Sequence, residues 1–247
     1  MTKNVMEELY NGVFQDDPRR LAFTRKASGL LPPMSQPRIL DIGCGRGGPT
    51  MELARLFDGH ITGLDTNQAA LDELERRAEE AGLSTRVDTV NASMKDIPFD
   101  EGTFDIIWTE GVIFQMGFER GLGEWKRFVK PGGYLVIHEM CWLRPDPPEE
   151  LARFWKGFFP GIATVEENIE TIEAQGIGVI DHFSLPDNTW REIYFKPLEE
   201  NIHRLREKYT DDPEAISLID RESRYIELDR KYPGWYGSAF YLIARTN

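Results

Sequence analysis

The chain has 247 residues, 40% of them hydrophobic, which is enough for one large domain with its own apolar core. Its formal net charge of −13 argues against binding to nucleic-acid backbones, because that affinity comes mainly from Lys and Arg side chains that neutralise phosphates. The charge therefore favours a small-molecule ligand over DNA or RNA. The chain has two cysteines, no apolar stretch of membrane-spanning length and a polar N-terminus without the features of a secretory signal, which predict a cytoplasmic protein.

The first 140 residues predict a helical arm followed by alternating strands and helices. The arm is a helical segment over Glu7–Leu31, ended by Pro32 and Pro33 because proline cannot continue a helix. Five short apolar runs are the expected strands: Arg38–Ile42, His60–Leu64, Arg86–Val90, Phe104–Thr109 and Tyr134–Met140. Two helices are expected between the first three of them, at Pro49–Phe57 and Gln68–Ala81.

Proline and glycine mark the end of this alternating part. The sequence Pro131-Gly132-Gly133 predicts a sharp turn into the fifth strand. Beyond it the pattern changes, and Leu198–Tyr209 and Pro213–Tyr232 combine helical spacing with many charges. These two segments predict an ordered helical region rather than a disordered linker.

The most informative segment is Arg38–Pro49, in which the first strand runs into a glycine-rich loop. Four glycines within Gly43–Gly48 let the backbone turn tightly and approach a ligand without clashes from Cβ atoms. The second strand is followed by Asp65, at the spacing at which a carboxylate binds ribose hydroxyls in mononucleotide-binding folds. We therefore expect a nucleoside cofactor at this loop.

Two classes of cofactor can use this geometry. Gly43–Gly48 satisfies the G-x-G-x-x-G pattern of NAD and FAD binding, although that pattern alone is weak evidence. Asp41 precedes the first glycine by two residues, and a carboxylate there would repel the pyrophosphate of a dinucleotide. S-adenosylmethionine has no phosphate but carries an ammonium and a sulfonium, so the acid favours it. An Asp41 that only hydrogen-bonds the backbone amides of the loop fits either ligand.

Five segments occur in an order and spacing that are hard to obtain by chance: Leu40–Gly48, Thr62–Asp65, Ala92–Phe99, Phe104–Gly111 and Val129–Leu135. With these segments the chain resembles the class I S-adenosylmethionine-dependent methyltransferases, and among them the ubiquinone/menaquinone-biosynthesis type of small-molecule enzyme. The resemblance implies methyl transfer from S-adenosylmethionine to a small-molecule acceptor, with S-adenosylhomocysteine as product.

The resemblance also implies the fold class, which is α/β with a Rossmann-like, doubly wound, seven-stranded and mostly parallel sheet. Such a sheet ends in an antiparallel pair of strands, for which Gly178–Leu185 and Ser238–Arg245 are suited. We expect one domain over residues 1–247, with an N-terminal helical arm at 1–31, a cofactor-binding core at 37–140 and a helical cap inserted at 186–236. The arm and the cap would close over the carboxyl ends of the strands, where ligands bind.

The implied cofactor-binding residues lie at the carboxyl ends of the first three strands: Asp41, Gly43, Gly45 and Gly47 at the methionine end, Asp65 at the ribose, and Thr66, Ser93 and Met94 at the adenine. Many relatives have a bulky apolar residue in place of Thr66 and an acid in place of Ser93. In the arm, Arg25 can pair with the carboxylate of the cofactor or lie exposed on its helix.

Three residues at strand ends are candidates for catalysis. Glu110 is the first candidate base, or else contributes a backbone carbonyl to the cofactor ammonium. His138 and Glu139 follow each other at the end of the fifth strand, and we expect only one to face the cleft because side chains alternate along a strand. Each of the three can instead be a hydrogen-bonded support. No metal site is expected, since the four histidines are scattered.

Aromatic residues are concentrated in the last hundred residues, and Trp142, Trp190, Tyr194 and Tyr236 are the candidate substrate-binding residues. They would suit a planar or apolar acceptor, or a cationic amine held over ring faces. The alternative is that they pack the cap onto the sheet. The sequence also leaves open an NAD-binding oxidoreductase, a non-catalytic S-adenosylmethionine-binding module, the methylated atom of the acceptor, and a homodimer formed through the arm or the cap.

Overall fold

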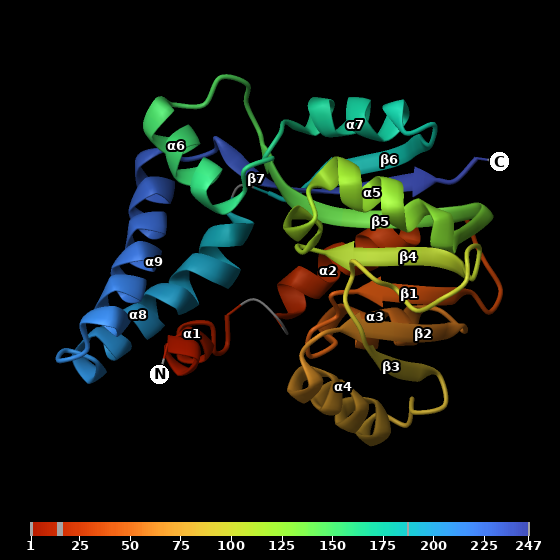
Figure 1. The fold of residues 1–247 in the computed structure, drawn as a ribbon, viewed down its shortest axis with the longest axis horizontal. Coiled ribbons are helices and arrows are strands. Elements are labelled where there is room, and N and C mark those ends of the chain that lie inside the picture. Colours follow the sequence, from red (N-terminus) through yellow and green to blue (C-terminus); the bar gives the residue numbers. More distant parts are fainter. Residues whose placement is uncertain (1, 14–16, 187, 247) are drawn as a thin grey trace.

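A seven-stranded sheet in the order β3-β2-β1-β4-β5-β7-β6 forms the centre of the computed structural model, which describes residues 2–13, 17–186 and 188–246 (Figure 1). The strands are β1 (Arg38–Ile42), β2 (His60–Asp65), β3 (Val87–Asn91), β4 (Phe104–Glu110), β5 (Val129–Trp142), β6 (Gly178–Ser184) and β7 (Tyr236–Ala244). Strands β1 to β5 pair in parallel, and β7 pairs antiparallel with both β5 and β6. The predicted Rossmann-like, mostly parallel sheet is confirmed.

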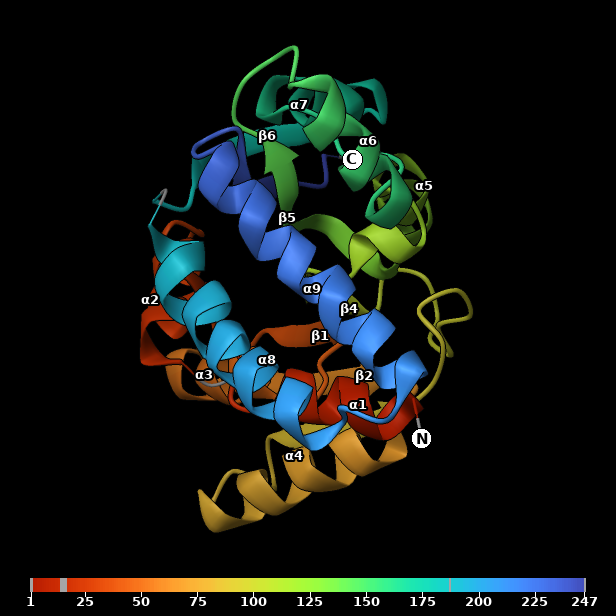
Figure 2. The same cartoon turned by 90° about the vertical axis from the view of Figure 1, so that its left-hand side faces the viewer.

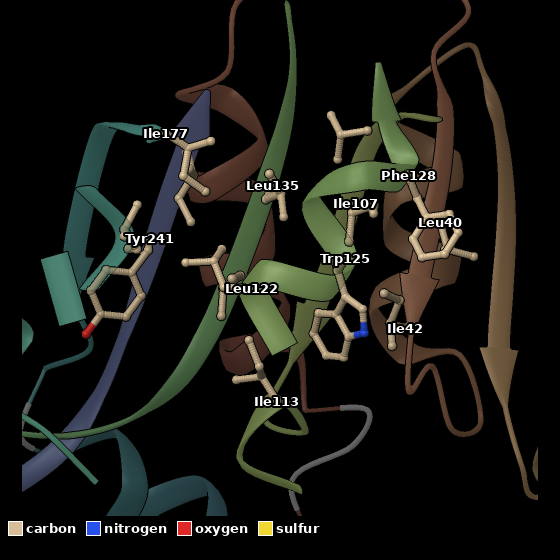
Figure 3. Packing of buried hydrophobic residues seen from close by; sticks show 14 of the residues in the cluster. Leu40, Ile42, Ile107, Ile113, Leu122, Trp125, Phe128, Leu135, Ile177 and Tyr241 are labelled. Carbon is tan, nitrogen blue, oxygen red and sulfur yellow. The ribbon is translucent and has the colours of Figure 1, made fainter. Parts of the chain in front are cut away.

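Apolar side chains cover both faces of the sheet. Successive residues of one strand enter different clusters: Ile106 and Trp108 of β4 belong to one cluster, and Ile107 between them belongs to the other. Figure 3 shows Ile107 among the buried side chains that Leu122 and Trp125 contribute from a helix on that face. Burial on both faces explains why these strands read as continuous apolar runs rather than as alternating ones.

Helices cover the sheet in the arrangement shown in Figure 1. The helices α2 (Pro18–Gly29), α3 (Gly48–Leu56) and α4 (Gln68–Glu80) lie on one face, with α2 packed on α3. The helices α5 (Phe118–Trp125) and α7 (Val165–Ala174) pack together on the other face. Helix α4 begins where the sequence provides a cap, because Asn67 accepts a hydrogen bond from the Ala70 amide.

A second group of helices lies beyond the carboxyl ends of the parallel strands. It consists of α1 (Thr2–Leu9), α6 (Glu149–Phe158), the short π-helix Arg191–Phe195, α8 (Lys196–Lys208) and α9 (Pro213–Lys231), and we call these elements the helical cap. Figure 2 shows α8 and α9 side by side, with α1 against their far ends. One apolar cluster joins all four α-helices to the end of β5. None of the helices in the described ranges is both long enough and apolar enough to span a lipid bilayer.

The structure corrects two of the predicted elements. The arm is not one helical segment over Glu7–Leu31 but two helices, since Pro18 starts α2 and Asp17 caps it by accepting from the Arg19 amide. Strand β5 is longer than predicted, and the expected turn at residues 131–133 lies inside it, where the register with β4 shifts and Gly132 has φ 79°. The first correction matters for the site, because α1 joins the helical cap and α2 packs on the core.

Candidate active site

A cavity of about 380 Å³ lies between the carboxyl ends of the strands and the helical cap. From the sheet side its walls include Asp41, Gly43, Gly45, Glu110, His138 and Glu139. From the arm and the cap they include Tyr10, Arg20, Phe154, Trp155, Trp190, Tyr194, Glu222 and Tyr225. The polar residues therefore lie mostly at the strand ends and the aromatic ones mostly in the cap.

The glycine loop forms one wall of this cavity and adopts backbone conformations that favour glycine. Gly43, Gly45 and Gly47 have φ values of 74°, 53° and 79°. A Cβ on Gly43 would lie 2.7 Å from a methyl of Val112, and one on Gly47 would lie 2.2 Å from a methyl of Leu74. Nothing lies within 4 Å of a Cβ placed on Gly45, which lines the cavity. Packing therefore requires the outer two glycines, whereas Gly45 leaves space for a ligand against the backbone. Gly47 itself does not line the cavity.

Asp65 holds this loop in place. Its Oδ2 accepts a hydrogen bond from the Gly45 amide at 3.0 Å, and its Oδ1 accepts from the Asn67 amide at 2.9 Å. The residue is half-buried, and Thr66 beside it is exposed. Neither residue lines the cavity, so the ribose role of Asp65 and the adenine role of Thr66 stay predictions.

The two residues predicted for the adenine lie just after β3 and are half-buried. The Ser93 hydroxyl accepts from the Lys95 amide at 3.2 Å, and the Met94 carbonyl accepts from the indole N–H of Trp125 at 3.0 Å. Neither of the two lines the cavity, and their adenine role likewise stays a prediction.

Asp41 is buried at the end of β1. Among the described residues its hydrogen-bond donor is the hydroxyl of Thr50 on α3, at 2.6 Å, and not a backbone amide of the loop. Burial raises the pKa of the Asp41 carboxyl to about 7, and the negative charge of Glu110 acts in the same direction, while Thr50 and Arg20 oppose it. The group can therefore carry either a proton or a charge near neutral pH.

Glu110 is ion-paired inside the protein. Its Oε2 lies 2.9 Å from Nη2 of Arg20, and the two side chains are only 3% and 7% exposed. Its Oε1 accepts from the Thr24 hydroxyl and from the Trp108 indole N–H, both at 2.9 Å. Both carboxylate oxygens thus already have partners. Glu110 therefore anchors α2 to the sheet and is poorly placed to act as a base.

The cation that reaches the cavity from the arm is Arg20, not the predicted Arg25. Arg25 forms an ion pair with Glu52 of α3 at 2.6 Å, is 43% exposed and does not line the cavity. The buried face of α2 consists of Arg20, Thr24 and Ala27, which follow at intervals of four and three residues. Two of these three residues are polar, so no apolar stripe in the sequence marks this face.

His138 and Glu139 both line the cavity, so the expectation that only one of them faces the cleft is wrong. Strand β4 ends at Glu110, opposite His138, and among the described residues no strand pairs with that edge of β5 at Glu139. The space beside this end of β5 is therefore open to side chains from both faces of the sheet. Glu139 accepts from the backbone amides of Phe114, at 3.1 Å, and Met140, at 2.7 Å. Burial raises the pKa of its carboxyl to about 7.

His138 is buried between β7 and the helical cap. Its Nε2 lies 2.8 Å from the hydroxyl oxygen of Ser238, which also accepts the indole N–H of Trp190 at 3.1 Å. Its ring stacks on Phe240 with a centroid distance of 4.5 Å. Burial, and secondarily the positive charge of Arg20, lowers the pKa of the imidazole to about 3.

The structure divides the four aromatic residues that were predicted to bind the substrate. Trp190 and Tyr194 line the cavity. Trp142 and Tyr236 do not, and are buried in the apolar cluster of the helical cap. The sequence did not single out Tyr10, whose hydroxyl donates to the buried carboxylate of Glu222 at 2.7 Å.

Metal-binding side chains do not gather in this site. Within residues 2–13, 17–186 and 188–246, no three His, Cys, Asp or Glu side chains are grouped so that they could hold a metal ion. The basic residues that line the cavity are Arg20 and Arg46, against the acidic residues Asp41, Glu110, Glu139 and Glu222. The cavity therefore lacks the surplus of positive charge that a phosphorylated ligand would need.

Comparisons with known proteins connect this site to methyl transfer. Residues 39–133 match a family described as "Methyltransferase domain". Sterol 24-C-methyltransferase erg-4 of Neurospora crassa is 28% identical over 184 residues, which cover 70% of this chain and 48% of that protein. The 27-O-demethylrifamycin SV methyltransferase of Amycolatopsis mediterranei is 26% identical over 187 residues, which cover 73% of this chain and 63% of that enzyme. The chain thus spans about half to two thirds of the length of these relatives.

Solved structures share the whole fold. A SAM-dependent methyltransferase from Geobacter sulfurreducens, crystallised with S-adenosylhomocysteine, superimposes with a TM-score of 0.81 at 20% sequence identity. The match covers 97% of each chain, so it includes elements of the helical cap as well as the sheet.

Proposed function

We propose that this chain, which belongs to the class I S-adenosylmethionine-dependent methyltransferases, methylates a small-molecule acceptor bound in the cavity under the helical cap. The observation that carries the proposal is the glycine loop, which leaves open space at Gly45 in a cavity that buried carboxyl groups also line. A pyrophosphate at this loop would lie near Asp41 and the Glu110 carboxylate, so the site disfavours NAD. A cofactor with an ammonium and a sulfonium suits the same charges.

The residues fit S-adenosylmethionine in the following way. Gly43 and Gly45 would contact its methionine part, and the ion pair of Arg20 and Glu110 offers a charge of each sign to a zwitterionic amino acid. Asp65 would accept hydrogen bonds from the ribose hydroxyls, and Ser93 and Met94, with Thr66, would lie near the adenine. Because Asp65 also holds the Gly45 amide, ribose binding and loop position are coupled.

When bound, S-adenosylmethionine supplies a methyl group on a positively charged sulfur, and its transfer to a nucleophilic atom of the acceptor leaves S-adenosylhomocysteine. The chain contributes a cavity that the helical cap shields from water. It also contributes Glu139, whose carboxyl has a pKa raised by burial to about 7 and can take the proton that the acceptor loses. Glu110 is the weaker candidate for this base, since Arg20 holds its charge.

The walls of the cavity indicate the kind of acceptor. Phe154, Trp155, Trp190 and Tyr225 present aromatic surface, which suits a planar or apolar molecule. The lack of surplus positive charge disfavours a phosphorylated one. A module that only bound the cofactor would not need this aromatic wall opposite the glycine loop, so the lining favours an enzyme.

Isothermal calorimetry tests the cofactor part of the proposal. S-adenosylhomocysteine is expected to bind the purified chain and NAD is not. Asp65→Ala is expected to weaken S-adenosylhomocysteine binding by roughly 10–100-fold, because a hydrogen bond to a charged group contributes about 1.5–3 kcal/mol. Asp88→Ala, at an exposed aspartate of the neighbouring strand, is the control and is expected to change nothing. Tight NAD binding, or equal affinity in the two variants, would contradict the proposal.

Labelled S-adenosylmethionine tests the reaction itself. Incubation of the chain with this cofactor and a metabolite extract is expected to transfer the label to a small molecule, which mass spectrometry then identifies. Glu139→Gln is expected to lower the rate of transfer and to retain S-adenosylhomocysteine affinity, since the amide cannot take up the proton.

A further inference from the structure

The side chains around His138 determine which of its ring nitrogens carries the proton. Ser238 is fully buried, and among the described residues its hydroxyl contacts only His138 and Trp190. The indole N–H of Trp190 can only donate, so the hydroxyl oxygen accepts it. The hydroxyl hydrogen then has one acceptor within reach, which is Nε2 of His138 at 2.8 Å. In the neutral ring, the proton is therefore on Nδ1.

The surroundings keep this ring neutral and fixed in orientation. His138 is buried, and burial together with the charge of Arg20 lowers its pKa to about 3, so it carries one proton at physiological pH. Phe240 stacks on the ring with a centroid distance of 4.5 Å and an interplanar angle of 24°. Nδ1–H is thus a hydrogen-bond donor at a defined position in a residue that lines the cavity.

This donor has no hydrogen-bond partner among the described residues. A second buried donor without a hydrogen-bond partner among the described residues is the indole N–H of Trp155, a residue of the helical cap that lines the same cavity. A buried donor without an acceptor costs about 1–3 kcal/mol, so two of them in one cavity indicate that a ligand supplies the missing acceptor atoms. Their origin in β5 and in α6 makes them independent observations.

We propose that His138 donates its Nδ1–H to an oxygen atom of the methyl acceptor, and that the acceptor is a planar or apolar molecule with a carbonyl or phenolic oxygen. The inference rests on the proposed function, because it assigns the cavity to the acceptor. In this role His138, which the sequence named as a candidate for catalysis, is a neutral donor that binds the oxygen and draws off negative charge, and not a general base. The base is then its neighbour Glu139.

Nuclear magnetic resonance on the full chain, with ¹⁵N-labelled histidine and saturating S-adenosylhomocysteine, tests the tautomer first. The signal of His138 is identified by its loss in His138→Phe. It is expected to show a neutral ring with the proton on Nδ1, unchanged between pH 5 and pH 8. A proton on Nε2, or a titration within this range, would overturn the inference. Failure of S-adenosylhomocysteine to bind in calorimetry would instead contradict the proposed function.

Three probes with the same ring system then test the bound atom: 1-indanone, 1-aminoindane and indane. The ketone is expected to shift the Nδ1–H signal, and the amine and the hydrocarbon are not. The Kd of the ketone is expected to rise about tenfold in His138→Phe, which keeps the aromatic stack, and to change less than threefold in His138→Asn, which keeps an N–H donor near the position of Nδ1. An unshifted signal with the ketone, or equal Kd values in the two variants, would overturn the proposal.

Discussion

Removing the carboxylate of Glu110 is expected to destabilise the protein strongly, because this group is ion-paired inside it. Glu110→Ala leaves the guanidinium of Arg20 buried without this counter-charge, and breaking a buried ion pair costs about 3–5 kcal/mol. The same change removes the acceptor of the hydrogen bonds from Thr24 and Trp108. These losses belong to one network and do not add, so the expected total stays within that range. The measurement is the free energy of unfolding in urea.

Two further variants separate charge from geometry. Glu110→Gln keeps an acceptor oxygen and loses the charge, so its loss of stability is expected to be smaller than that of the alanine variant. Combining it with Arg20→Met is expected to recover most of the stability, because a buried ion pair can often be replaced by uncharged groups at little cost. The matched control is Glu52→Ala, which breaks the pair between Glu52 of α3 and the 43% exposed Arg25 of α2 and is expected to cost about 1 kcal/mol or less.

A loss below about 1 kcal/mol in Glu110→Ala would refute the reasoning, since it would mean that solvent stabilises the buried Arg20. A double variant as unstable as the sum of the single ones would refute it as well, because the two side chains would then not be coupled. Calorimetry adds a second readout. Since Arg20 lines the cavity, Glu110→Ala is expected to weaken S-adenosylhomocysteine binding, and Glu52→Ala is not.

Matched substitutions test the loop, one buried acid and two tryptophans. Gly45→Ala is expected to weaken S-adenosylhomocysteine binding and to cost about 1–2 kcal/mol of stability. Gly47→Ala is expected to cost more stability, because its Cβ would clash with Leu74. Calorimetry measures the effect on binding, and urea unfolding measures the effect on stability. Because burial raises the pKa of Asp41 to about 7, the folded chain keeps a proton that the unfolded chain releases near pH 4, so this group's contribution to stability is lost as the pH rises from about 4 to 7. Urea unfolding at pH 5 and pH 8 is expected to show a smaller decrease in Asp41→Asn, and an unchanged decrease would contradict the assignment. Trp142→Ala is expected to cost about 3–5 kcal/mol without selective loss of acceptor turnover, while Trp190→Phe, which lacks the indole N–H, is expected to lower turnover more than S-adenosylhomocysteine affinity.

Local signals predicted the sheet well. Strand β1 begins and ends at the predicted residues, because a short apolar run precedes a loop whose glycines adopt positive φ. Helices α3 and α4 were predicted to within one residue at each end, since a proline, an asparagine cap and apolar periodicity mark them. The conformations of the glycine loop, of strand β1 and of the helix N-termini each depend on residues that are neighbours in the sequence. These elements carry the residues expected to bind the cofactor.

The acceptor part of the cavity depends on contacts that no local pattern records. Tyr10 and Glu222 form a hydrogen bond across 212 residues of sequence, and α6, which contributes Trp155, was not predicted. Which face of α2 is buried also depends on packing against α3, so Arg20 and Arg25 could not be distinguished by residue type. Aromatic residues that pack the helical cap and those that line the cavity have the same composition, and only the three-dimensional arrangement separates them.

Three carboxyl groups line the sheet side of the cavity, and their surroundings give them different chemistry. Glu110 is fixed by a guanidinium, and Asp41 accepts a single hydroxyl hydrogen at the base of the glycine loop. Glu139 accepts two backbone amides, is buried and has a pKa raised to about 7, which suits a group that must bind and release a proton near neutral pH. Its neighbour His138 is neutral for the same reason, because burial disfavours the charged form of either group, and for a base this lowers the pKa. The protonated Nδ1 of the neutral ring can then only donate. Consecutive residues of β5 thus provide a proton acceptor and a hydrogen-bond donor at one cavity, which is the combination that activates a nucleophile while holding an oxygen close to it.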